Sequence, residues 1–76
     1  MSITQAFRGG FENRPGWWLS FDFDQGTIDA LKAAIPARER SWDPEAKRWW
    51  IAVEFEAAVM RIMPSFEAYL TQGALF

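Results

Sequence analysis

Hydrophobic and polar residues alternate most clearly between residues 17 and 23. A period of two places successive side chains on opposite faces of a β-strand, so this pattern predicts a strand with one buried face. Residues 3–7 predict a short edge strand before it, and a loop rich in glycine separates the two. The residues expected on the buried face are Trp17, Leu19, Phe21 and Phe23.

Apolar residues then recur at helical spacing. Ile28, Leu31 and Ile35 lie on one side of a predicted helix. This helix is expected to have Thr27 as its N-cap and to end at Pro36. A second apolar stripe farther along predicts another helix, which a proline ends. Its residues are Phe55, Val59, Ile62 and Met63.

Between the two helices, residues 38–42 and 47–53 predict the strands of a β-hairpin. Asp43, Pro44 and Glu45 suit its turn, which is expected to begin with an Asx-type hydrogen bond. The predicted order is therefore strand, strand, helix, strand, strand, helix.

This order favours an α+β fold, in which a small antiparallel sheet of three or four strands carries two helices on one face. Residues 1–76 are expected to form one domain, because 76 residues are enough for one at most, and a domain of this size buries only about 60% of the surface that its unfolded chain would expose. The core is expected at about residues 17–63, followed by a tail at residues 64–76 in which Ser65 could cap a last short helical turn carrying Phe66, Tyr69 and Leu70.

Composition argues against catalysis and against a metal site. The chain has no cysteine and no histidine, so thiolate and imidazole ligands and the usual proton shuttle are missing. Asp22, Asp24 and Asp29 match no known cation-binding loop. We expect no enzyme activity, no metal and no cofactor. No apolar run reaches the roughly 20 residues that span a bilayer, and no signal peptide is evident, so a cytoplasmic location without membrane contact is expected.

The hairpin carries a short motif of an aromatic residue and aspartate, a turn, a basic pair and a tryptophan. Its residues are Trp42, Asp43, Lys47, Arg48 and Trp49. With this motif, residues 19–60 resemble the HARP domain, a small module found beside the motor domain of annealing helicases. The resemblance implies a fold like that of small repeats that bind single-stranded nucleic acid, and a role in contacting DNA. The chain differs from the family in lacking a motor domain, in its slight acidity and in having Trp50 at a position that tends to be polar.

Tryptophans occur twice as adjacent pairs, and neighbouring residues of a strand face opposite ways. Trp17 and Trp49 share a face with apolar neighbours, which leaves Trp18 and Trp50 on the outer face. An exposed tryptophan can stack on an unpaired base or anchor a protein interface. In the alternative, residues 64–76 fold over both and cover them.

Basic residues at both ends of the hairpin could flank these indoles and contact phosphates. Acidic residues interleave with them and the formal charge of the chain is −2, so a hairpin with cross-strand ion pairs is the alternative. The candidate binding residues are Trp18, Arg38, Arg40, Lys47, Arg48 and Trp50.

Two functions follow from these features. The first is a non-catalytic module that binds single-stranded or junction DNA through an aromatic and basic sheet face. The second is a protein-interaction module, such as a small phage-type inhibitor that covers the nucleic-acid site of a larger nucleic-acid-processing protein. The acidity and the apolar end at Ala74, Leu75 and Phe76 favour the second. A homodimer that closes the edge strand at residues 3–7 is left open.

Overall fold

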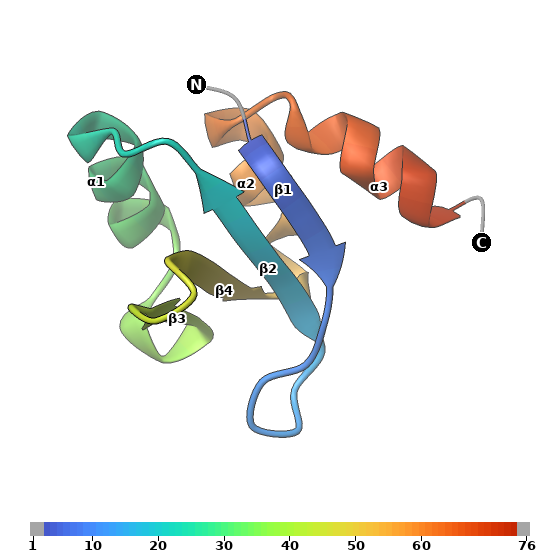
Figure 1. The fold of residues 1–76 in the computed structure, drawn as a ribbon, viewed down its shortest axis with the longest axis horizontal. Coiled ribbons are helices and arrows are strands. Elements are labelled where there is room, and N and C mark those ends of the chain that lie inside the picture. Colours follow the sequence, from blue (N-terminus) through green and yellow to red (C-terminus); the bar gives the residue numbers. More distant parts are fainter. Residues whose placement is uncertain (1–2, 75–76) are drawn as a thin grey trace.

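A four-stranded antiparallel sheet forms the centre of the protein in the computed structural model, which describes residues 3–74 (Figure 1). The strands are β1 (Ile3–Arg8), β2 (Gly16–Phe21), β3 (Arg40–Asp43) and β4 (Arg48–Ala52), in the order β1-β2-β4-β3 across the sheet. Each pair of neighbours is antiparallel. The expected α+β class and the hairpin are confirmed.

Three α-helices accompany the sheet: α1 (Gln25–Ala34), α2 (Glu56–Ile62) and α3 (Phe66–Ala74). Helix α2 lies behind the sheet in Figure 1, and α3 runs beside the β1 edge. The ββαββα order is therefore followed by a third helix, which is longer than the last short turn expected in the tail after Ser65. Leu75 and Phe76, which bear on the proposed apolar end, lie outside the described residues.

The N-cap of helix α1 lies three residues before Thr27, the residue expected to form it. Asp24 is the N-cap, and its carboxylate accepts hydrogen bonds from the backbone N–H of Gly26 at 3.1 Å and the hydroxyl of Thr27 at 2.9 Å. A carboxylate at this position satisfies backbone donors that have no partner inside the helix. Thr27 is therefore not the N-cap; its hydroxyl stabilises the Asp24 carboxylate that is.

The hairpin turn has the expected Asx geometry. Asp43 Oδ1 accepts from the backbone N–H groups of Glu45 at 3.1 Å and Ala46 at 3.2 Å. Lys47 then adopts a φ of 55°, in the left-handed region that ordinary side chains rarely occupy. This local bend brings β4 back alongside β3.

The core lies between the sheet and the helices and extends beyond residues 17–63 at both ends, because Ile3 and Phe66 belong to it. The ring of Phe66 meets Trp17 edge to face, with the ring centroids 5.1 Å apart. Phe23 is not part of the core: β2 ends at Phe21, and Phe23 is 78% exposed. The buried core residues are Ile3, Trp17, Leu19, Leu31, Ile35, Ile51, Val59, Met63 and Phe66.

The segment around α3 also covers the start of the β1 edge. Ile3 N–H donates to Ser65 Oγ at 3.1 Å, and Tyr69 O–H donates to the carbonyl oxygen of Ile3 at 3.3 Å. Residues 64–70 are thus used on the helix side of the sheet and at its edge. Dimerisation through residues 3–7 stays a prediction.

Candidate functional site

Trp50 does not form an exposed platform on the outer face of the sheet. Trp18 and Trp50 are cross-strand partners on that face, as the alternation predicts, but Trp50 is only 1% exposed and Trp18 is half-buried. The β1–β2 loop covers Trp50: the ring of Phe11 lies 5.3 Å from it, and its indole N–H donates to the Gly9 carbonyl oxygen at 3.1 Å. The expected exposure of Trp50 is therefore wrong, because the β1–β2 loop covers it.

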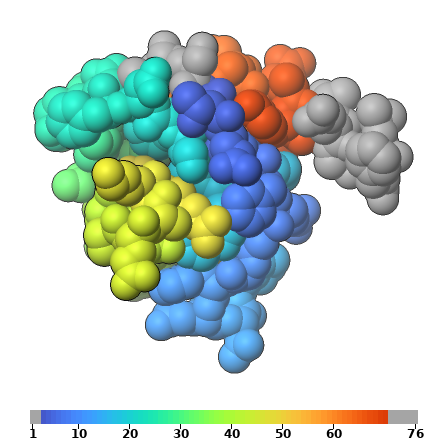
Figure 2. Space-filling model, viewed as in Figure 1, coloured from blue at the N-terminus to red at the C-terminus, as the bar shows by residue number. Residues whose placement is uncertain are grey.

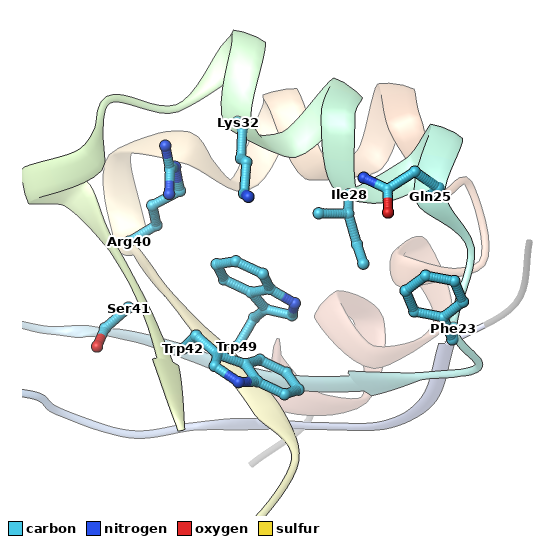
Figure 3. A pocket seen from close by; sticks show the side chains of 8 residues that line it. All are labelled: Phe23, Gln25, Ile28, Lys32, Arg40, Ser41, Trp42 and Trp49. Atoms are coloured by element: carbon cyan, nitrogen blue, oxygen red, sulfur yellow. The ribbon is translucent and has the colours of Figure 1, made fainter. Parts of the chain in front are cut away.

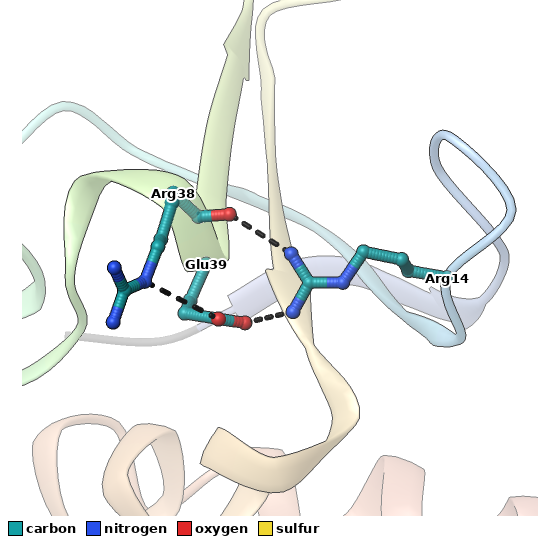
Figure 4. A network of polar contacts seen from close by, with 3 residues as sticks. All are labelled: Arg14, Arg38 and Glu39. Atoms are coloured by element: carbon teal, nitrogen blue, oxygen red, sulfur yellow. Dashed lines mark hydrogen bonds and ion pairs between the residues drawn. The ribbon is translucent and has the colours of Figure 1, made fainter.

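Arg14 links the β1–β2 loop to Arg38 and Glu39, which directly precede the edge strand β3. Its guanidinium donates to the backbone carbonyl oxygen of Arg38 at 3.0 Å and pairs with the carboxylate of Glu39 (Figure 4). The Cζ atom of Arg14 also lies 5.7 Å from the centroid of the Trp50 ring. The loop is thus held over Trp50 by charge and by cation–π attraction together.

Arg48 occupies the remaining aromatic surface of the outer face. Its Cζ lies 4.4 Å from the Trp18 ring centroid and 5.2 Å from that of Phe7. Arg48 Nε is 3.8 Å from Asp43 Oδ2, an ion pair across the hairpin of the kind weighed as the alternative reading. In Figure 2 the hairpin, in yellow, reaches the blue surface of β1. A base could stack on Trp18 only after Arg48 moved away.

An open groove lies instead on the opposite side of the sheet, between α1 and the β3–β4 hairpin. It consists of two adjoining hollows of about 660 and 340 Å³, both lined by Phe23, Ile28, Trp42 and Trp49. Figure 3 shows these four side chains around the cavity, with Trp42 and Trp49 next to each other. We call this cavity the α1–hairpin groove.

Two aromatic rings of the groove are open to solvent. Trp42 is 47% exposed and Phe23 is 78% exposed. The Trp42 ring rests against the buried Trp49 ring, with the centroids 5.2 Å apart and the planes tilted by 48°. Trp42 faces the helices, but it lies on β3, which is an edge strand of the sheet formed by the described residues. One indole is therefore supported from behind and accessible in front.

The charges that line the groove are positive. Lys32, Arg40 and Lys47 border its two hollows, and none of the described lining residues is acidic. Figure 3 shows Lys32 reaching from α1 toward the ring of Trp49. Arg40 is held in place because its Nε donates to the carbonyl oxygen of Ile35 at 2.9 Å. The local charge thus differs in sign from the net charge of the chain.

The candidate binding residues named from the sequence do not lie together in the structure. Arg40 and Lys47 line the α1–hairpin groove, whereas Trp18 and Arg48 lie on the outer face and Trp50 is buried. Arg38 is on the 3₁₀ turn Ala37–Glu39, with 87% of its side chain exposed. Sequence reasoning missed Phe23, Lys32 and Trp42 as site residues. Trp42 is part of the short hairpin motif of aromatic residue, aspartate, turn, basic pair and tryptophan, which was the available signal.

No family model, no curated protein and no solved structure matches the chain. Within the described residues, no group of three or more acidic side chains is placed to hold a metal ion. Among the helices of the described part, none has the length and apolarity needed to cross a membrane. The groove is therefore assessed on its own chemistry.

Proposed function

We propose that the chain is a non-catalytic binding module that holds unpaired nucleic acid, in a single strand or at a DNA junction, in the α1–hairpin groove. The observation that carries this proposal is the half-exposed ring of Trp42 beside the exposed ring of Phe23, in a groove bordered by cations. Stacking on an aromatic ring contributes roughly 1 to 3 kcal/mol for each base.

The cations support a polyanionic ligand. Lys32 and Arg40 border the larger hollow and Lys47 borders the smaller one, so positive charge is present along both. Proteins that bind single strands combine such a charged track with aromatic rings on which bases stack. The resemblance of residues 19–60 to the HARP domain favours the same class of ligand. The compartment we propose is the cytoplasm, where such a ligand is present.

A labelled oligothymidylate of about ten nucleotides tests the proposal, with fluorescence anisotropy as the measurement. Trp42→Ala is expected to weaken binding by about tenfold, because it removes the accessible indole. Phe7→Ala is the control: Phe7 is also partly exposed, but it lies on the outer face opposite Trp18. Thermal unfolding of both variants checks that each is folded.

Duplex DNA of the same length is expected to bind more weakly, because its bases are stacked on each other and cannot reach Trp42. The proposal is wrong if the wild-type protein does not bind the single strand at low salt. It is also wrong if Phe7→Ala weakens binding as much as Trp42→Ala does.

A protein-interaction module is the second candidate, and the exposure of Phe23 favours it. Phe23 is a large apolar side chain that is 78% exposed at the rim of a groove, as expected for an interface anchor. This candidate becomes the better one if the oligonucleotide does not bind and a partner protein is captured by the wild type but lost with Phe23→Ala.

A further inference from the structure

The indole N–H of Trp49 opens on the α1–hairpin groove and has no hydrogen-bond partner among the described residues. Trp49 is only 8% exposed. The two other buried tryptophans both use this group: Trp17 Nε1 donates to the carboxylate of Glu56, and Trp50 Nε1 donates to the Gly9 carbonyl oxygen. Figure 3 shows the Trp49 nitrogen turned toward the part of the groove between Gln25 and Phe23. Because this donor faces the groove and no acceptor among the described residues meets it, a ligand in the groove can supply the acceptor.

Gln25 places an acceptor at the same cavity. Its Nε2 donates to Asp29 Oδ1 at 2.9 Å, one helical turn along α1. Because a carboxylate only accepts, the amide nitrogen must face Asp29, and the amide oxygen is left for the groove. Figure 3 shows that oxygen on the cavity side of the side chain.

We infer that the groove reads the Watson–Crick edge of an unpaired nucleobase, with Trp49 Nε1–H as donor and Gln25 Oε1 as acceptor. This inference rests on the proposed nucleic-acid function and adds recognition of the base itself. Each base carries an acceptor next to a donor on that edge, as thymine does with O4 and N3–H. In a duplex both groups are used by the opposite base, so only an unpaired base can satisfy the groove.

The edge contact predicts a dependence on the base that phosphate binding alone does not. A strand held only by Lys32, Arg40 and Lys47 would bind equally well with or without a hydrogen-bonding base edge. A base held by Gln25 should lose affinity when its donor is blocked. Blocking the N3–H donor of thymine therefore distinguishes binding through phosphates alone from binding that includes the base edge.

The experiment is a cycle of one protein change and one ligand change. The protein change is Gln25→Ala, and the ligand change replaces thymine by N3-methylthymine throughout the oligothymidylate. Each change alone is expected to weaken binding by about fivefold, the effect of one neutral hydrogen bond. With Gln25→Ala, methylation should have little further effect, because the acceptor it would meet is already gone. Gln5→Ala, an exposed glutamine on β1, is the matched control and should behave as wild type.

The outcomes separate this inference from the proposed function. If unmodified oligothymidylate does not bind, the proposed function fails. If it binds and methylation costs the same in wild type and Gln25→Ala, the edge contact is absent, while nucleic-acid binding stands. An oligonucleotide with abasic positions that binds as well as oligothymidylate would overturn both, because then neither stacking on Trp42 nor the edge contact contributes.

Discussion

The indole N–H of Trp50 donates a 3.1 Å hydrogen bond to the backbone carbonyl oxygen of Gly9. This bond joins the centre of β4 to the loop between β1 and β2. The two bonded residues are 41 positions apart in the sequence. Although Trp50 lies on the face of the sheet that the helices do not cover, it is buried beneath this loop. The outer face therefore has a small apolar core of its own.

Trp50→Phe is expected to destabilise the protein by about 2 kcal/mol, because it removes buried ring volume and leaves the Gly9 carbonyl oxygen without its donor. Chemical denaturation measures this change. Trp42→Phe is the matched control and should cost less than about 1 kcal/mol, since Trp42 is half exposed. Equal losses for the two variants would contradict the burial of Trp50.

Gly16→Ala is expected to destabilise the protein by about 2 kcal/mol or more. A Cβ at residue 16 would come within 2.2 Å of the Ile51 carbonyl oxygen and 2.6 Å of the Trp50 ring. Neither can move without distorting the β2–β4 ladder. Gly26→Ala provides the comparison, because a Cβ there meets only Asp24 Oδ1 at 3.6 Å and α1 gains from alanine, so stability should stay level or rise by up to about 1 kcal/mol. Thermal unfolding of both proteins decides this, and a tolerated Gly16→Ala would count against the close approach.

Arg14→Ala is expected to loosen the β1–β2 loop and expose Trp50. Acrylamide quenching of tryptophan fluorescence should increase, and stability should fall by about 1 kcal/mol. The loss is modest because water screens the Arg14–Glu39 pair, whose arginine side chain is 38% exposed. Arg38→Ala keeps the backbone carbonyl that Arg14 uses, so it should leave quenching unchanged. If both variants give the same quenching, Arg14 does not hold the β1–β2 loop over Trp50.

Affinity for a single strand is expected to fall with salt along a log–log slope of about −2, as release of counterions by three groove cations requires. Lys32→Gln should reduce the magnitude of this slope by about 0.7. Arg61→Gln on α2 changes the net charge equally but lies outside the groove lining, so its slope should match the wild type. Identical slopes for Lys32→Gln and Arg61→Gln would show that binding senses total charge and not the groove.

Local patterns were sufficient to assign most elements. The alternation through residues 17–21 correctly separates Trp17 and Leu19 from Trp18, and the apolar spacing in α1 correctly places Leu31 and Ile35 in the core. The Asx turn at Asp43 follows from residue type alone. These features depend on a few neighbouring residues, whose backbone geometry the side chains themselves determine.

The candidate site was harder to predict because accessibility depends on what lies across the sheet. The face predicted for Trp50 is correct. The loop that covers Trp50, however, consists of residues 9–15, which are distant from Trp50 in the sequence and are held by the ion pair of Arg14 with Glu39. Trp42 lies on the helix side of the sheet, where burial is the usual outcome, so no local pattern marks it as accessible. It remains open because β3 is at the sheet edge and α1 leaves a groove beside it.

The sequence by itself determined the class of fold, most of the strand and helix segments and the face of the sheet on which each of the paired tryptophans lies, since side-chain periodicity is a local property of the backbone. Only the tertiary structure decided which face is open to a ligand. That outcome depends on contacts between segments distant in sequence, such as Arg14 with Glu39 and Trp50 with Gly9, and no local pattern encodes which surface those contacts cover.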